Sequence, residues 1–251
     1  MSADSRIGII ADAALASSAM SRPPSTTTLA FSRADLDAAP RELLRDGRWA
    51  NARVERVTLG SALWTLKDFA PRSFLVRNTI GRYLVRRELR MLARLRGIDG
   101  IPHDAFRVDG HALAARHLPG TLLSSLPAER VSTPFLEALE TLLRRVHACG
   151  VVHLDTGGGS NLLMLTDGSP GLIDFQAALS TRWMPGALRT TLEGIDLRGI
   201  YKKWLQLQPQ SLGEARRARF EQAARWRRLW ILRGYLGVRR RSAMAQPAPG
   251  P

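Results

Sequence analysis

Residues 151–176 read VVHLDTGGGSNLLMLTDGSPGLIDFQ, and this stretch decides how the rest of the chain is interpreted. Residues 162–165 and 171–173 are two short apolar runs, and the turn-forming sequence TDGSP separates them. Apolar runs on both sides of such a turn predict a β-hairpin. Asn161 stands immediately before the first run and Asp174 immediately after the second. The predicted hairpin therefore carries a polar residue on each strand at its open end.

The register of this hairpin brings oxygen-bearing side chains together. If Asp167 and Gly168 are the centre of a type I′ turn, residues whose numbers sum to 335 face each other, and Asn161 then faces Asp174. An amide oxygen and a carboxylate are hard ligands of the kind that Mg²⁺ prefers. Asp155 lies a few residues upstream, on a loop that begins with two valines. We expect all three oxygen-bearing side chains to converge at the mouth of the hairpin.

Asp155 in a His-Leu-Asp sequence, then Asn161, then Asp174 in an Asp-Phe dipeptide resemble the catalytic loop and the Asp-Phe-Gly metal motif of protein kinases. The chain is similar in this respect to the small bacterial protein-kinase-like family that includes the lipopolysaccharide core-sugar kinases. The resemblance implies that ATP and Mg²⁺ bind, with Asp155 as the catalytic base and Asn161 and Asp174 as the metal ligands. It also implies an α+β, bilobal fold with a small N-terminal antiparallel sheet lobe and a mainly helical C-terminal lobe.

Several positions depart from the protein-kinase pattern. Five residues instead of four separate Asp155 from Asn161, Gly157 stands where such kinases commonly carry Lys, and Gln176 replaces the Gly of Asp-Phe-Gly. A glycine-rich phosphate loop is not recognisable in the sequence that precedes Lys67. Phosphate binding would then depend on Lys67, Mg²⁺ and nearby arginines. An ordinary hairpin, in which the Asp and Asn residues only form turns, is the alternative.

Lys67 and Glu88 are candidates for a buried ion pair. Residues 54–57 and 63–66 predict two strands, and Lys67 ends the second. Glu88 is the only acidic residue in 72–98, and it lies on the apolar stripe of a predicted helix, where an unpaired carboxylate is costly. Its partner is either Lys67 or one of the arginines at the margin of the stripe on the same helix, which are Arg82, Arg87 and Arg90. The resemblance implies the pair with Lys67, which positions ATP in such enzymes.

The chain is expected to divide into four segments by composition. They are a disordered N-terminal segment (1–30), an N-terminal lobe (31–118), a C-terminal lobe with a basic C-terminal helix (119–241) and a disordered tail (242–251). Met20 is a candidate alternative start, because core-forming residues are lacking before it. Further elements are expected from apolar periodicity and turn signals: a helix at 35–48, strands at 101–108 and 112–115, a helix that Thr133 caps and Gly150 ends, and helices at 195–205 and 213–241.

Composition limits the partners and the compartment. The formal net charge is +15 and the isoelectric point is about 11.4, so we expect acidic partners. The single Cys149 excludes an intramolecular disulfide, and apolar runs of about 20 residues are lacking, so we expect a cytoplasmic protein. The arginine-rich and aromatic stretch 213–241 predicts either peripheral contact with an anionic inner membrane or a core helix with a solvated basic face. Nucleic acid is a disfavoured partner, because a base-reading motif is lacking.

The sequence after Gln176 bears on the acceptor. An Ala-Pro-Glu motif does not follow, and only about twenty residues separate Asp174 from the helix predicted at 195–205. Such a short segment does not suit an extended peptide, so we expect an ATP-dependent kinase that phosphorylates a lipopolysaccharide core sugar. The alternatives are a protein Ser/Thr kinase and a non-catalytic, nucleotide-binding pseudokinase. Asp196, near the start of the predicted helix, is a candidate to brace the catalytic loop, and the alternative is an ordinary interaction of an aspartate with the helix dipole.

Overall fold

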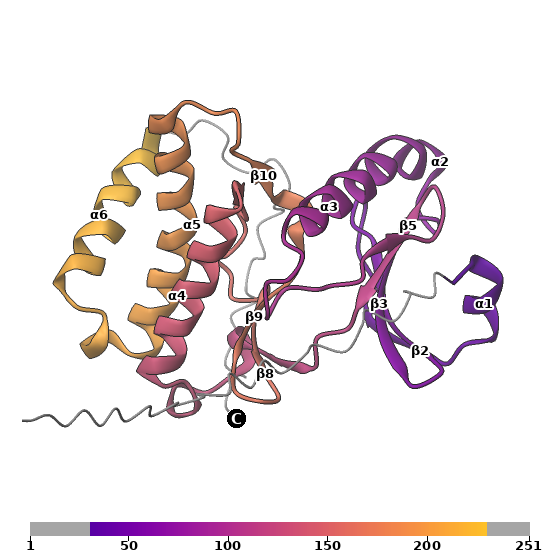
Figure 1. Cartoon of the computed structure of the whole chain (residues 1–251), viewed down its shortest axis with the longest axis horizontal. Coiled ribbons are helices and arrows are strands. Elements are labelled where there is room, and N and C mark those ends of the chain that lie inside the picture. Colours follow the sequence, from indigo (N-terminus) through magenta and orange to yellow (C-terminus); the bar gives the residue numbers. More distant parts are fainter. Residues whose placement is uncertain (1–30, 230–251) are drawn as a thin grey trace, which may run out of the picture.

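The computed structural model describes residues 31–229, which form a mixed α/β structure (Figure 1). An antiparallel sheet occupies the first half of this range, and a group of helices occupies the second. The disordered segments predicted at 1–30 and 242–251 lie outside the described residues, as do Met20 and the part of the predicted basic helix beyond residue 229. Within 31–229, no helix is both long enough and apolar enough to cross a membrane.

The sheet has five strands in the order β1-β2-β3-β5-β4, and all its pairings are antiparallel. The strands are β1 (Arg41–Arg45), β2 (Arg53–Leu59), β3 (Ala62–Asp68), β4 (Phe106–Arg107) and β5 (Ala112–Arg116). The strands predicted at 54–57, 63–66 and 112–115 are confirmed. The strand predicted at 101–108 is confined to two residues, so that prediction is mostly wrong.

The helix predicted at 35–48 is wrong beyond Ala38. The helix α1 spans Arg33–Ala38 and ends before Pro40, because a residue that precedes proline favours extended backbone, and Ala39 has φ −84° and ψ 142°. Beyond the proline, Arg41–Arg45 is an edge strand that pairs with β2. The chain therefore returns to the sheet at the point where the sequence pattern still suggested a helix.

A helical segment packs on the sheet between β3 and β4. It consists of α2 (Phe74–Val76), a π-helical turn (Arg77–Gly81) and α3 (Arg82–Arg94). The predicted stripe of α3 is buried and includes Glu88. Gly81 is needed in the turn, because a Cβ there would lie 2.9 Å from the side chain of Phe69.

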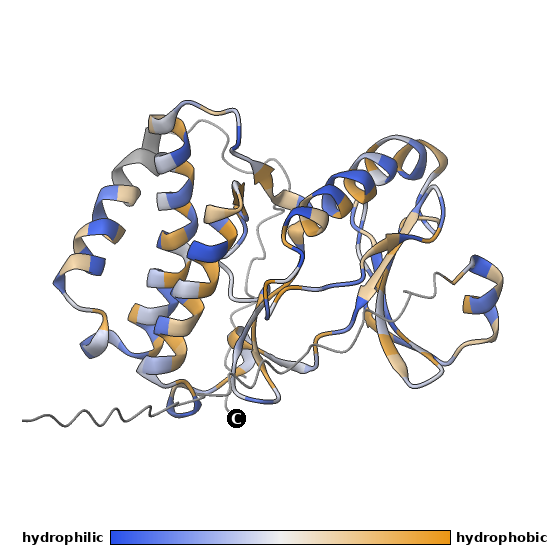
Figure 2. Cartoon of the chain, viewed as in Figure 1, coloured by the Kyte–Doolittle hydropathy of each residue, from blue (hydrophilic) through white to orange (hydrophobic). Residues whose placement is uncertain are grey.

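The second half is built on three long helices, α4 (Thr133–Ala148), α5 (Gly186–Leu207) and α6 (Glu214–Leu229). The hydroxyl oxygen of Ser132 accepts a hydrogen bond from Phe135 N at 3.3 Å, so the cap is Ser132 and the predicted cap, Thr133, is wrong by one residue. The helix α5 begins nine residues before the predicted position of 195. Apolar faces of α4 and α5 pack together (Figure 2), and Tyr201 and Trp204 are fully buried there. Burial of each leucine or isoleucine side chain in this core contributes about 1.5–3 kcal/mol.

Short elements lie between β5 and α4, between α4 and α5, and between α5 and α6. The strands are β6 (Gly120–Leu122), β7 (Val151–Val152), β8 (Leu162–Leu165), β9 (Pro170–Leu172) and β10 (Leu179–Ser180), and the 3₁₀ helices are η2 (Leu123–Ser125), η3 (Ala128–Arg130), η4 (Phe175–Ala177) and η5 (Pro209–Ser211). Strands β6, β8 and β9 form one small sheet, and β7 pairs with β10. Both small sheets are antiparallel.

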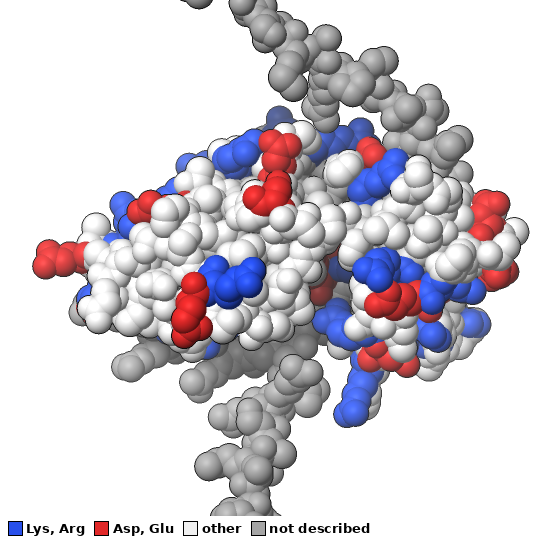
Figure 3. Space-filling model, turned by 90° about the horizontal axis from the view of Figure 1, so that it is seen from below, with Lys and Arg blue, Asp and Glu red and all other residues white. Residues whose placement is uncertain are grey.

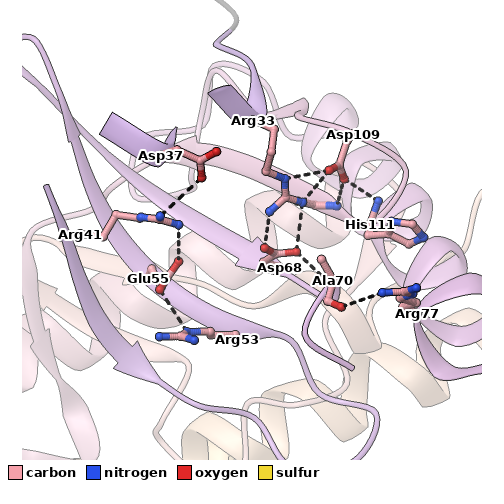
Figure 4. Close-up of polar contacts among 11 residues, drawn as sticks. Arg33, Asp37, Arg41, Arg53, Glu55, Asp68, Ala70, Arg77, Asp109 and His111 are labelled. Atoms are coloured by element: carbon pink, nitrogen blue, oxygen red, sulfur yellow. Dashed lines mark hydrogen bonds and ion pairs between the residues drawn. The ribbon is translucent and has the colours of Figure 1, made fainter. Parts of the chain in front are cut away.

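An ion-pair cluster, here called the Arg33 clamp, joins α1 to the main sheet (Figure 4). Its members are Arg33, Asp68 on β3 and Asp109 in the β4–β5 turn. Arg33 Nη2 donates to Asp68 Oδ1 at 3.2 Å, and Arg33 Nε donates to Asp109 Oδ2 at 2.9 Å. Backbone N–H groups complete the carboxylates: Ala70 N lies 2.8 Å from Asp68 Oδ1, and His111 N lies 2.7 Å from Asp109 Oδ1. The clamp holds the first helix against the sheet.

Candidate active site

The β8–β9 hairpin is present, but its register differs from the predicted one. Leu162 faces Leu172, so facing residues sum to 334 instead of 335. The loop has three residues, because Leu165 N donates to Ser169 O at 2.8 Å and Gly168 adopts a left-handed φ of +82°. The predicted two-residue type I′ turn, and the cross-strand pairing of Asn161 with Asp174 that depended on it, are therefore wrong.

The side chains at the mouth of the hairpin converge by another route. Asn161 Nδ2 donates to Asp155 Oδ2 at 2.8 Å and to Asp155 O at 2.9 Å. Asp174 lies one residue beyond the position opposite Asn161, where Ile173 N donates to Asn161 O at 3.0 Å. Asp174 has a left-handed backbone, with φ 67° and ψ 68°, which is uncommon for a residue other than glycine. The position of Asp174 is therefore set by an irregular turn after β9 and not by pairing between the strands.

Lys67 connects the hairpin to the main sheet and to α3. Its Nζ donates to Glu88 Oε1 at 2.7 Å and to Asp174 Oδ1 at 2.8 Å. Of the two partners that the sequence left open for Glu88, the structure gives Lys67. Lys67 and Glu88 are both buried. The lysine therefore holds together two carboxylates that lie 86 residues apart in the chain.

Burial and charge act against each other in this cluster. Burial opposes the charged form of Asp174, but Lys67 and Arg45 outweigh it and lower the pKa of Asp174 to about 2. Burial also opposes the charged form of Lys67, but Asp174 and Glu88 outweigh it and raise the pKa of Lys67. Asp174 and Lys67 are consequently charged at neutral pH. Burial raises the pKa of Asp155, and the hydrogen bond from Asn161 offsets this only in part. Burial raises the pKa of Glu88 as well, but Glu88 is bonded to Lys67, so Asp155 is the carboxylate with a raised pKa that lies outside the lysine pair and can serve as a proton acceptor.

The loop that carries Asp155 lies along α5. Asp196 is buried in the middle of that helix and accepts hydrogen bonds from His153 N and Leu154 N, each at 2.5 Å. The expectation that Asp196 braces the loop is confirmed, although Asp196 lies well inside α5 and not near its start. A Cβ at Gly199 would lie 2.0 Å from Thr156 Oγ1, so only glycine allows the loop to lie this close to the helix.

Arg45 is a residue of the site that the sequence analysis missed. Its Nη2 lies 3.4 Å from Asp174 Oδ2. It was overlooked because residues 35–48 were interpreted as a helix, which would not carry an arginine into the site. Pro40 is the signal that could have separated α1 from the strand that ends at Arg45.

The oxygen-bearing residues fit Mg²⁺ that is bound together with a nucleotide. Among residues 31–229 there is no group of three or more His, Cys, Asp or Glu side chains arranged to hold a metal ion alone. Mg²⁺ commonly takes one or two carboxylates and completes its shell with phosphate oxygens and water. The Asp174 carboxylate is charged and can bind a cation. The hydrogen bonds of Asn161 use Nδ2, so Asn161 Oδ1 is the atom of that side chain that can bind a cation.

No protein-family model matches the chain, and a comparison with curated proteins gives no match. The interpretation of the site therefore depends on its own geometry. That geometry comprises a buried lysine between two carboxylates, and an amide and a third carboxylate bonded to each other at the mouth of the hairpin. Such a set can bind a negatively charged, metal-complexed ligand and can accept a proton.

Proposed function

We propose that this protein is an ATP- and Mg²⁺-dependent phosphotransferase of the protein-kinase-like type that phosphorylates a hydroxyl of a lipopolysaccharide core sugar. One observation carries the proposal: Lys67 Nζ bonds both Glu88 and Asp174, and Asn161 bonds Asp155 at the adjoining hairpin. Segments far apart in the chain converge on these five residues. Structural ion pairs do not require an additional amide and carboxylate beside them.

The arrangement of the elements supports a bilobal, kinase-like fold. In protein kinases the phosphate-binding lysine lies on the third strand, and its glutamate partner lies on the following helix. Lys67 lies on β3 and Glu88 on α3, which is the helix that follows. The five-stranded sheet in the first half and the helices in the second half match the lobes that the resemblance implies.

The mechanism assigns a separate task to each side chain. Lys67, oriented by Glu88, binds the phosphates of ATP. Asn161 and Asp174 hold Mg²⁺, which when bound neutralises charge on the phosphates. Asp155 orients the acceptor hydroxyl and accepts its proton while the new oxygen–phosphorus bond forms and the bond to the ADP oxygen breaks. A raised pKa suits Asp155 for this role, because a base with an ordinary carboxyl pKa is weak at neutral pH.

Arg45 supports phosphate binding in a chain that lacks a recognisable glycine-rich loop. Arg45 is the last residue of β1, before the β1–β2 connection, and its guanidinium group lies beside Asp174. A guanidinium group binds phosphate through two parallel hydrogen bonds. We therefore assign to Arg45 part of the work that backbone N–H groups perform in glycine-rich loops.

The short connection after Asp174 supports a small or glycolipid acceptor. The helix α5 begins at Gly186, so only residues 175–185 connect it to Asp174. This connection is even shorter than the sequence analysis expected, and it contains η4 and β10. An extended peptide would find little surface along such a segment. The expected site of action is the cytoplasm, where ATP is available.

The test is transfer of labelled γ-phosphate from ATP into fractionated cell envelope, with lipopolysaccharide separated from protein. We predict that Asp155→Asn lowers transfer into lipopolysaccharide by about 10²- to 10⁴-fold and leaves nucleotide binding intact. Asp167→Asn is the matched control, because Asp167 is an exposed aspartate in the turn of the same hairpin. It is expected to transfer like the wild type.

Each other outcome of the transfer assay favours a different function for this protein. Transfer that Asp155→Asn leaves unchanged would contradict the assigned base. Label in protein that depends on Asp155 would favour a protein Ser/Thr kinase. Nucleotide binding without label in either fraction would favour the pseudokinase, which the glycine at position 157 also suits.

A further inference from the structure

The helical segment from α2 to the start of α3 exposes large apolar side chains. Phe74 and Leu75 are 74 % and 71 % exposed, and Ile80 and Tyr83 are exposed as well. The other side of the same segment is buried on the sheet. A cluster of exposed apolar side chains on one element is unusual for a protein surface that faces only water.

Arginines surround these apolar side chains. Arg82, Arg86, Arg90 and Arg94 are exposed on α3. Glu88 is the only acidic residue in 72–98, and it is buried against Lys67. The exposed charge of this helical segment is therefore entirely positive. Blue and orange alternate along α2 and α3 in Figure 2, which reflects this mixture.

The connection between β10 and α5 carries a further exposed aromatic side chain. Trp183 is 87 % exposed, and the guanidinium carbon of Arg182 lies 5.4 Å from the centre of its ring. Arg87 on α3 donates hydrogen bonds of 2.8 Å to the carbonyl oxygens of Ala177 and Ala178, so α3 lies against the segment immediately before β10, and Trp183 follows three residues after that strand. The helix α3 and the connection between β10 and α5 both lie along the upper edge of the molecule in Figure 1. We call the exposed residues Phe74, Leu75, Ile80, Tyr83 and Trp183, with the arginines between them, the upper face.

A basic pocket adjoins the upper face. It has a volume of about 360 Å³, and Arg144, Arg182 and Arg189 contribute to its lining. Thr181 also lines it, and the hydroxyl of Thr181 is buried without a hydrogen-bond partner among the described residues. Glu193 also lines the pocket and its Oε1 lies 3.8 Å from Arg189 Nε, so three guanidinium groups and one carboxylate surround the unpaired hydroxyl, and their net positive charge fits an anionic group such as a phosphate.

We propose that the upper face docks the protein on an anionic lipid bilayer. The apolar side chains enter the acyl boundary, the arginines contact the headgroups, and the pocket receives a headgroup phosphate. Charge decides against a second copy of the chain as the occupant, because a symmetric interface would bring the arginines of both copies together. The face seen from below, in Figure 3, carries both signs of charge among many uncharged residues, so it does not offer the same attraction.

The proposal does not depend on phosphotransfer, so the two can fail separately. The experiment measures sedimentation of the full chain with vesicles of phosphatidylcholine alone and with vesicles that also contain phosphatidylglycerol. We expect binding only when phosphatidylglycerol is present, and weaker binding as salt increases. The variant Phe74→Ser/Leu75→Ser/Trp183→Ser is expected to bind at least about tenfold more weakly.

Two further variants control for other surfaces. Leu43→Ser/Leu44→Ser removes two exposed leucines of β1, at the other edge of the sheet, and is expected to bind like the wild type. Replacement of the arginines at 239–241 by glutamine tests the basic C-terminal sequence. The proposal fails if the upper-face variant binds like the wild type, or if the leucine control loses as much binding. It also fails if light scattering shows that the upper-face variant only converts a dimer into a monomer.

Discussion

Lys67 and Asp68 are neighbours on β3, yet their side chains enter two different clusters, because successive residues of a strand point to opposite faces. Each cluster places two carboxylates around one cation. In the Arg33 clamp, the cation is a guanidinium group between Asp68 and Asp109. In the candidate site, it is the Lys67 ammonium between Glu88 and Asp174.

The clusters differ in what completes their carboxylates. Backbone N–H groups of neighbouring turn residues complete Asp68 and Asp109 in the clamp. In the candidate site the second oxygen of Asp174 faces Arg45 at 3.4 Å, which is at the long limit of a hydrogen bond. The clamp is therefore complete by itself, whereas the candidate site retains a carboxylate oxygen for a further cation. We infer that the clamp stabilises the fold and that the other cluster serves binding and chemistry.

Glu88→Gln gives the largest expected difference between the clusters. The amide keeps the shape of the side chain but no longer holds the Lys67 ammonium as a charged partner, so phosphoryl transfer is expected to fall about 100-fold. Lys67 keeps Asp174 as a charged partner, and burial raises the pKa of Glu88, so its charge is itself costly; the free energy of unfolding is therefore expected to change by about 1 kcal/mol or less.

Transfer kinetics and chemical denaturation measure the two quantities on the same variant. Glu137→Gln, at an exposed position on α4, is the matched control and should leave both unchanged. A loss of several kcal/mol of stability in Glu88→Gln, with transfer retained, would reverse the roles that we assign to the two clusters.

Arg33→Met is expected to give an effect of intermediate size. In contrast to Glu88→Gln, it should lower stability and leave transfer nearly unchanged. It removes the cation of the clamp and leaves two carboxylates close together, so we expect a loss of about 1–2 kcal/mol in the free energy of unfolding. Transfer should stay within about twofold of the wild type, because Arg33 does not contact the candidate site. Denaturant titration and the same transfer assay test this variant. A loss of transfer as large as that of Glu88→Gln would show that the clusters are not independent.

Asp109→Asn gives the smallest expected effect, and it depends on pH. Burial opposes the charged form of Asp109, but hydrogen bonds from His111 and Arg33 outweigh it and lower its pKa below the usual value. The contribution of Asp109 to stability is therefore present above about pH 4 and is lost as the pH falls through the lowered pKa. Asp109→Asn should lose less stability than the wild type over this range, by under about 1 kcal/mol, because the site is partly exposed. Thermal unfolding at stepwise lower pH measures it, and identical acid curves would contradict the assignment.

The candidate site could be named from the sequence, but its geometry could not. Asp155, Asn161 and Asp174 were named from their order in the chain, and their convergence was expected from a hairpin register that the structure does not have. The predicted register was wrong because the sequence Asp-Gly suits both a two-residue turn and a three-residue loop with Gly168 in the left-handed region. Local sequence does not choose between these turns, whereas packing of the whole hairpin does.

The edge of the fold was harder to predict than its centre. The sequence RELLR at 41–45 has residues that favour helices, and only pairing with β2 makes it a strand. Arg45 was lost with that error. The Lys67–Glu88 pair could be predicted, because a lone acidic residue on an apolar stripe needs a partner and Lys67 was already a candidate.

The bonds that assemble the candidate site also constrain the order in which the chain can fold. Lys67 meets Asp174 across 107 residues, and Asp196 meets the backbone of His153 across 43. Loop closure over such distances makes contacts form late and slowly. During synthesis, Lys67 and Glu88 emerge from the ribosome well before Asp174 exists. The newly made sheet can therefore carry its buried pair, but the site is complete only when the second half of the chain has folded against it.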